Sequence, residues 1–189
     1  MKVLAIVPTH DRLEFLDAAL GSLVAQTRPA NEVIVIGNVM TPTSYPNITY
    51  MASDASLATR LNATIDASDC DAYMILSDDD TVLPLFIEKT VGVMKSTGAD
   101  IVWTEFDTIP VTALFRKSIW KKTGGYCDIG FWDWDFKWSC GTANAYNVHL
   151  AEHLFQYNQH PAQVAQHALW RADGTWDAWT AAIYAKHSK

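Results

Sequence analysis

Short runs of consecutive apolar residues alternate with segments of helical periodicity through the first half of this chain. The apolar runs are rich in β-branched residues and cover 3–7, 33–36, 73–76 and 101–103. Between them, apolar residues recur at helical spacing over 13–25, 57–67 and 85–96. Continuous apolar runs are typical of parallel strands that are buried on both faces. The alternation therefore predicts a doubly wound α/β sheet, in which ligands bind beyond the carboxyl ends of the strands.

Capping and turn residues predict where several of these elements begin and end. Ser53 or Asp54 is expected to cap the helix over 57–67, and Gly98 is expected to close the helix over 85–96. Gly124 and Gly125 predict a sharp turn. Weaker patterns predict a short strand over 48–51, a strand over 111–115, a helix over 117–122 and helical stretches within 165–185.

Three consecutive carboxylates, Asp78, Asp79 and Asp80, follow the apolar run that ends at Leu76. Adjacent anions repel one another and Asp is a poor strand former, so a fold usually keeps such a cluster where a cation binds. Oxygen ligands favour a hard divalent ion, Mg²⁺ or Mn²⁺, which is often shared with a phosphate. The alternative is a solvated acidic turn, because short acidic loops are common.

The composition narrows the classes of function. A length of 189 residues fits one domain with a sizeable core. The net charge of −7 argues against a broad nucleic-acid-binding face, which needs Lys and Arg at the phosphates, but it allows a small anionic ligand. Cys70, Cys127 and Cys140 contain no CxxC pair, so neither a disulfide framework nor a zinc site is predicted and a cytoplasmic location is expected. No signal peptide or membrane helix is expected.

Within the segment 128–138, two carboxylates, Asp133 and Asp135, lie among five aromatic side chains. A carboxylate that loses solvation becomes a better general base, and a metal at the acidic triplet would neutralise a leaving diphosphate. The alternative is that both carboxylates lie on the solvent-facing side of a strand or helix whose aromatics pack inward. His160 taken alone is more typical of a surface or core histidine than of a ligand, and no HExxH motif indicates zinc.

Several short motifs follow one another along the chain, at 6–12, 20–27, 61–63, 76–80 with Pro84, 115–126, 132–135 and 154–161. In this order they resemble the "IPTYNR" start, the "ALxSLLAQT" helix end, "LNxG", the "DxD…P" metal motif, "FRRxxxxxxGGF", "EDxD" and the late "YRxHxxS" element of the family-2, A-type nucleotide-sugar glycosyltransferases. The resemblance extends over about residues 3–166. Each motif is weak alone, but their shared order makes the resemblance specific.

This resemblance implies a single-domain α/β structure of the nucleotide-diphospho-sugar transferase type (GT-A, Rossmann-like), with a mostly parallel central sheet flanked by helices. Its parts would be a nucleotide-sugar and metal half over 1–100, an acceptor and catalytic half over 101–167, and a tryptophan-rich helical tail over 168–189. The resemblance further implies a UDP- or GDP-linked sugar donor, Mn²⁺ or Mg²⁺ as cofactor, a hydroxyl acceptor and inversion at the anomeric carbon.

The matched positions also carry expected roles. Asp133 matches the base that deprotonates the acceptor, and Asp135 is the second expected catalytic carboxylate. Asp79 matches the leading metal ligand, with Asp80 and His160 as further metal contacts. The donor-binding residues that the resemblance implies are Pro8, Thr9, Asp11, Arg12, Asn38, Asn62, Asp78, Asp79 and His160.

Two departures from the family pattern concern the donor. Gly37-Asn38 stands where the family has an Asp for the nucleobase, and Asn158 replaces an Arg that would pair with phosphate. A sugar-nucleotide-binding module without turnover is therefore the second hypothesis, and a metal-dependent phosphohydrolase is the third. The tryptophans of the tail have four interpretations: a cover over the acceptor groove, a membrane-docking surface, a seam in a homo-oligomer, or core packing. They are Trp170, Trp176 and Trp179.

Overall fold

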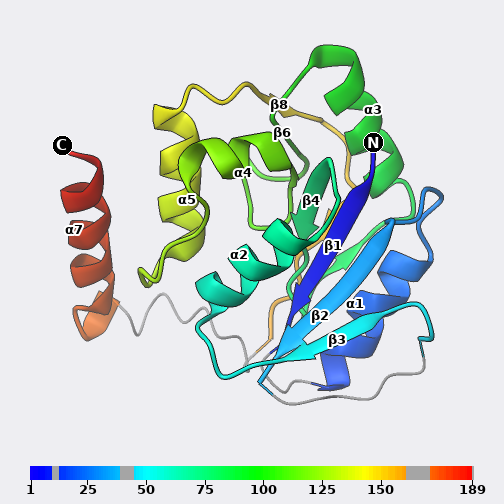
Figure 1. Ribbon diagram of the computed structural model, residues 1–189, viewed down its shortest axis with the longest axis horizontal. Helices are drawn as coiled ribbons and strands as arrows, with labels where there is room; N and C mark the ends of the chain where they lie inside the picture. Colours follow the sequence, from blue (N-terminus) through cyan, green and yellow to red (C-terminus); the bar gives the residue numbers. More distant parts are fainter. Residues whose placement is uncertain (10–12, 39–44, 161–170, 189) are drawn as a thin grey trace.

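The computed structural model describes residues 1–9, 13–38, 45–160 and 171–188, and its centre is a seven-stranded sheet (Figure 1). The strands are β1 (Val3–Pro8), β2 (Glu32–Gly37), β3 (Thr49–Ala52), β4 (Ala72–Ile75), β6 (Ile101–Trp103), β7 (Leu114–Arg116) and β8 (Asn147–His149). Their order in the sheet is β3-β2-β1-β4-β7-β6-β8. Only β7 runs antiparallel to its neighbours β4 and β6. The predicted α/β class with a mostly parallel sheet is confirmed.

Helices cover both faces of this sheet. They are α1 (Leu13–Val24), α2 (Leu57–Ala67), α3 (Phe86–Thr97), α4 (Lys117–Thr123), α5 (Trp132–Thr142) and α7 (Thr175–His187). Alternate residues of β1 enter two separate cores: Val7 packs in one with Leu16 and Phe86, and Ile6 packs in the other with Leu61 and Phe136. The sheet is therefore buried on both faces, which explains the continuous apolar runs of its strands. Among the described helices, none is long and apolar enough to span a membrane, and the cytoplasmic location stays a prediction.

Two predicted element ends differ from the structure. Ser56 rather than Ser53 or Asp54 caps α2, with its Oγ accepting a hydrogen bond from the Thr59 backbone N–H at 3.2 Å. The predicted strand over 111–115 begins only at Leu114, because the Ala113 N–H donates to the Val111 carbonyl in a turn. Gly98 ends α3 in the left-handed conformation with φ of 79°, as predicted.

A small second sheet, which no sequence pattern predicts, joins two distant segments of the chain. It consists of β5 (Thr81–Val82) and β9 (Phe155–Gln156), paired antiparallel with Val82 opposite Phe155. Glu105, in the left-handed region with φ of 70°, accepts hydrogen bonds from the backbone N–H groups of Leu154 and Phe155. The β5–β9 pairing and the hydrogen bonds to Glu105 together bring the chain that follows β9 against the turn that precedes β5.

Helix α7 lies at the outer edge of the molecule, beyond α5 (Figure 1). Its last turn is attached to α5 through Asp135, whose fully buried carboxylate contacts Lys186 Nζ at 2.6 Å and His187 Nε2 at 2.9 Å. Its first turns pack on the start of α5, where a Cβ added to Gly130 would lie 1.9 Å from the Trp179 ring. The predicted helical tail is thus present over 175–187 and is docked onto the domain.

Candidate active site

Three buried carboxylates lie at the carboxyl end of β4. Asp78, Asp79 and Asp80 have exposed fractions of 1%, 8% and 3%, so the triplet is not a solvated turn. The Asp80 N–H donates to the Ser77 carbonyl at 3.1 Å and tightens the turn. Thr9, directly after β1, donates its hydroxyl to Asp78 Oδ2 at 2.8 Å. Because β1 and β4 are parallel neighbours, their carboxyl ends meet at one edge of the sheet, as the sequence predicted.

The chain after β9 completes this edge. Asn158 donates its backbone N–H to Asp80 Oδ1 at 3.0 Å and its side-chain Nδ2 to the Asp79 carbonyl at 2.7 Å. His160 Nε2 lies 3.1 Å from Asp79 Oδ2, and the His160 ring packs against Phe15 with centroids 4.1 Å apart. The residues that follow the small β5–β9 sheet therefore hold the acidic turn in place.

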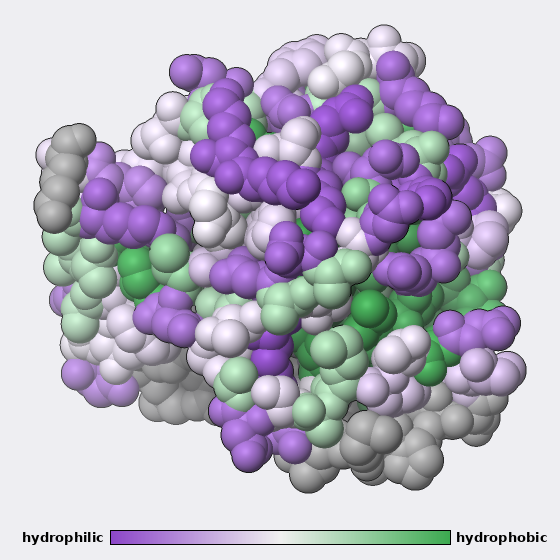
Figure 2. Space-filling model, viewed as in Figure 1, coloured by the Kyte–Doolittle hydropathy of each residue, from purple (hydrophilic) through white to green (hydrophobic). Residues whose placement is uncertain are grey.

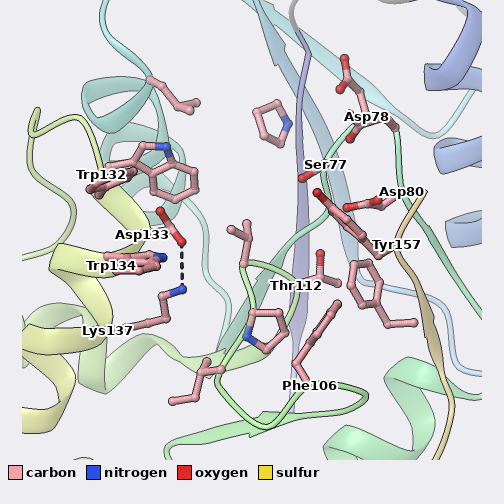
Figure 3. Close-up of a pocket in the computed structure, with 18 of the residues that line it drawn as sticks. Ser77, Asp78, Asp80, Phe106, Thr112, Trp132, Asp133, Trp134, Lys137 and Tyr157 are labelled. Carbon is pink, nitrogen blue, oxygen red and sulfur yellow. Dashed lines mark hydrogen bonds and ion pairs between the residues drawn. The ribbon is translucent and has the colours of Figure 1, made fainter. Parts of the chain in front are cut away.

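A cavity of about 650 Å³ connects the acidic turn with the start of α5 (Figure 3). Pro8, Thr9 and Asn38 line it from the ends of β1 and β2, and the acidic turn lines it from the end of β4. Figure 3 shows Asp133 on the wall formed by α5, with the acidic turn and Tyr157 on the opposite side. The volume falls within the roughly 300–1,000 Å³ of small-ligand sites.

Asp133 is positioned by an ion pair within α5. Lys137, one helical turn further on, places Nζ 2.8 Å from Asp133 Oδ2, and both side chains are about one fifth exposed. Both residues line the cavity, and the dashed contact between them faces its interior (Figure 3). A carboxylate oriented in this way can accept a proton from a group bound in the cavity.

Comparison with known proteins decides the family. The model of glycosyl transferase family 2 matches residues 4–155. The chain belongs to glycosyl transferase family 2. The chain has no match among curated proteins.

Solved structures share the fold of this family-2 member. S. aureus TarS 1-349 in complex with UDP-GlcNAc matches with a TM-score of 0.74 at 14% identity, covering 86% of this chain and 60% of that chain. Mannosyltransferase PcManGT from Pyrobaculum calidifontis, in complex with GDP-Man and Mn²⁺, matches with a TM-score of 0.71 at 15% identity, covering 90% and 59%. The chain thus spans less than two thirds of the length of these structures. Their likeness confirms the GT-A fold that the motifs implied.

Asp135 does not reach the cavity of this family-2 member, contrary to the expectation that it is a second catalytic carboxylate. It is fully buried and ion-paired with α7. Its partner Lys186 has a raised pKa: burial opposes the charge, but the hydrogen bonds to Asp135 and Cys127 outweigh burial. Residues two apart on a helix point in different directions, so α5 sends Asp133 to the cavity and Asp135 to the tail.

Asn62 also lies away from the cavity, although its motif implied a donor contact. Its Nδ2 donates to the Tyr126 carbonyl at 2.8 Å. Its Oδ1 accepts from the Tyr126 N–H at 2.9 Å and from Trp120 Nε1 at 3.0 Å. A Cβ added to Gly125 would lie 2.5 Å from this oxygen, and Gly125 has φ of 80°. Asn62 therefore stabilises the turn before α5, which carries Asp133.

We expect Asn62→Ala to lower the free energy of unfolding by about 2–3 kcal/mol, because it leaves the Tyr126 N–H and Trp120 Nε1 without their acceptor. Chemical denaturation measures this change, and Asp66→Ala on the exposed face of α2 is the control. Nucleotide affinity of the folded variant should stay unchanged. An affinity loss with unaltered stability would instead support the direct donor contact.

Arg60 is a cavity residue that the motif comparison missed. Its guanidinium comes from α2, and its Nε and Nη1 are buried without a hydrogen-bond partner within the described part of the chain. Guanidinium groups bind phosphate and carbonyl oxygens through several parallel hydrogen bonds. The sequence offered one signal for Arg60. It lies three residues after Leu57 on the expected helix, so the two side chains share one face, and both line the cavity. The expected donor contacts Asp11 and Arg12 lie outside the described residues.

The acidic turn fits a divalent cation only in part. In the described ranges, no group of three or more His, Cys, Asp or Glu side chains is arranged to hold a metal. Asp79 and His160 nevertheless bring a carboxylate and an imidazole nitrogen within 3.1 Å of each other beside the cavity. Mg²⁺ is usually bound through one or two carboxylates and completed by substrate phosphates. These residues therefore suit a metal that binds together with its nucleotide.

Proposed function

We propose that this chain transfers a sugar from a nucleoside diphosphate sugar to an acceptor hydroxyl, with inversion at the anomeric carbon. The observation that carries the proposal is that one cavity contains both the buried acidic turn and Asp133. A diphosphate needs positive charge or a metal at one end of such a site, and the acceptor needs a base at the other. We keep the division into a donor half over 1–100 and an acceptor half over 101–167 as part of this proposal, with His160 reaching back to the donor half.

Asp133 is the proposed general base. It takes the proton of the acceptor hydroxyl as the acceptor oxygen forms a bond to the anomeric carbon. The bond from that carbon to the diphosphate oxygen breaks, and the nucleoside diphosphate leaves. Lys137 orients the carboxylate before the acceptor binds. A single displacement of this kind inverts the anomeric configuration, because attack and departure take place on opposite faces of the sugar.

Asp79, Asp80 and His160 are the proposed ligands of Mn²⁺ or Mg²⁺. When bound, the ion would supply Lewis-acid stabilisation of the charge that develops on the leaving diphosphate. Asn158 restrains this set, because it donates to the Asp79 carbonyl and to the Asp80 carboxylate. An Asn at this position thus has a structural role even though it removes the expected phosphate partner.

The nucleoside is proposed to bind along the ends of β1 and β2. Pro8, Thr9 and Asn38 line this part of the cavity, and Arg60 brings the guanidinium that can donate to an oxygen of the donor nucleotide. Thr9 also holds Asp78, so the nucleoside side and the acidic turn are linked. The similar structures hold UDP-GlcNAc and GDP-Man, which makes UDP- and GDP-linked sugars the donors to test.

The test is the release of nucleoside diphosphate from UDP-GlcNAc, UDP-glucose and GDP-mannose, with Mn²⁺ and a set of methyl glycosides as acceptors. We expect release of UDP or GDP that depends on both the metal and an acceptor, and a product anomer opposite to that of the donor. Binding without release would instead indicate a sugar-nucleotide-binding module. Release of inorganic phosphate without an acceptor would indicate a phosphohydrolase.

A further inference from the structure

A second cavity of about 370 Å³ opens beside the first, between α5, α7 and the loop over 104–113. Thr108, Ile109, Trp134 and Lys137 line both cavities, so the two are continuous. The remaining wall comes from the second half of α5 and from α7. We call this second cavity the aromatic groove. It extends the site on the side of Asp133, away from the acidic turn.

The wall formed by α7 is held by specific packing. Phe131 contacts the rings of Trp176 and Trp179 edge-to-face, with centroids 4.7 Å and 4.9 Å apart. Trp134 meets Trp176 in the same way at 5.3 Å. At the other end of α7, the buried Asp135 holds Lys186 and His187. Because both ends of α7 are attached to α5 or to Phe131 just before it, the helix is held at a fixed distance from the opposite wall, and the groove has a defined width.

Large aromatic faces are exposed in this groove. Trp134, Trp138 and Tyr184 are 45%, 41% and 52% exposed, although each already contacts another ring. Trp138 meets Tyr184 edge-to-face at 5.1 Å, which fixes the angle between the two rings. The space-filling view shows apolar surface where α7 meets the rest of the molecule (Figure 2). Exposed aromatic clusters in a concave site are typical of binding surfaces.

Polar groups accompany these rings. Thr180 on α7 lines the groove, and its Oγ1 is buried without a hydrogen-bond partner among the described residues. Thr108 and Lys137 add a hydroxyl and an ammonium on the opposite side. A ligand that suits this lining needs an apolar face for the rings and hydroxyl groups around its edge. A pyranose ring has both, since its C–H bonds form a flat apolar face and its hydroxyls lie at the rim.

We propose that the aromatic groove binds a pyranose ring of a saccharide acceptor, adjacent to the sugar whose hydroxyl faces Asp133. That the bound saccharide is the acceptor rests on the proposed transferase function. Trp134 and Lys137 line both the groove and the cavity, and this continuity carries the assignment. A saccharide bound in the groove can extend into the cavity and place its next sugar beside Asp133. A hydrocarbon chain in the groove would leave the Thr180 hydroxyl buried and unpaired.

The test uses methyl glycosides of glucose, galactose, mannose and N-acetylglucosamine, with binding followed by saturation-transfer NMR and tryptophan fluorescence. We expect at least one glycoside to bind in the absence of any nucleotide, with saturation reaching its ring C–H protons. Tyr184→Ala and Trp138→Ala should each weaken its affinity about tenfold, whereas Trp138→Phe keeps a ring and should lose less. Tyr146→Ala, which removes an equally exposed aromatic outside both cavities, should leave the affinity unchanged.

Three results would overturn the proposal. The first is that none of the four glycosides binds. The second is that binding is indifferent to Tyr184→Ala and Trp138→Ala in variants whose thermal stability is intact. The third is that octyl β-glucoside and an octyl chain without sugar bind equally while methyl β-glucoside does not, which would indicate a lipid groove. Nucleotide binding is measured separately: glycoside binding without nucleotide binding would contradict only the transferase function, and the reverse would contradict only the groove.

Discussion

Asp133→Asn is expected to lower kcat for sugar transfer by about 10²–10⁴-fold, the range that a general base usually contributes. The amide keeps the shape of the carboxylate but cannot accept the acceptor proton. Donor affinity should stay unchanged, because Asp133 lies on the wall formed by α5 and not at the acidic turn (Figure 3). Steady-state kinetics with the donor that the nucleotide-release assay selects, together with nucleotide titration, separates the two quantities.

Asp135→Asn is the matched control in the same helix turn. It weakens the ion pairs with Lys186 and His187, so we expect a lower melting temperature and a looser α7. The kcat of the folded variant should remain within a few-fold of the unsubstituted protein. Equal losses of kcat in both variants would contradict the assignment of Asp133 as the base, since Asp135 contacts α7 and does not line the cavity.

Asp79→Ala is expected to abolish the metal-dependent part of nucleotide stabilisation. A ligand at about 100 times its Kd stabilises a folded protein by about 2.7 kcal/mol, which for a chain of this size raises Tm by about 5–10 °C. We expect that increment with Mn²⁺ and UDP or GDP in the unsubstituted protein and its disappearance in the variant. Differential scanning fluorimetry with and without EDTA measures it, and each variant is compared with its own ligand-free Tm.

Asp69→Ala is the control for this experiment, because Asp69 is 93% exposed and precedes β4, at the opposite edge of the sheet. The Asp69→Ala variant should keep the full rise in Tm that the nucleotide causes. If a metal-dependent rise in Tm survived Asp79→Ala, the ion would have to be bound by other residues. An increment that never depends on Mn²⁺ or Mg²⁺ in any variant would remove the metal from the proposal.

The donor side of the site was largely predictable from local sequence. The apolar runs at 3–7 and 73–76 fold as β1 and β4, and their carboxyl ends must meet because parallel neighbours share an edge. That rule places Thr9 and Asp78 at the same edge of the sheet, and the structure adds the hydrogen bond between them. The helix end at Gly98 was equally predictable, since a left-handed residue there favours glycine.

The acceptor side was not predictable in the same way. In the pattern Trp132-Asp133-Trp134-Asp135, a strand would place both carboxylates on one face, whereas a helix separates them. The structure has a helix, and the partners of Asp135 come from residues more than fifty positions away. Asn62 and the β5–β9 pairing depend on equally distant partners.

The sequence by itself determined the α/β class and the carboxylate cluster at the sheet edge, because these follow from hydrophobic periodicity and from the shared edge of parallel strands. The order of its motifs, by resemblance, indicated the family. The tertiary structure alone decided which carboxylate faces the cavity, that Arg60 joins it, and that α7 forms a groove beside it. The physical reason is that these features depend on side-chain packing between elements far apart in the chain. Residue spacing does not encode such packing.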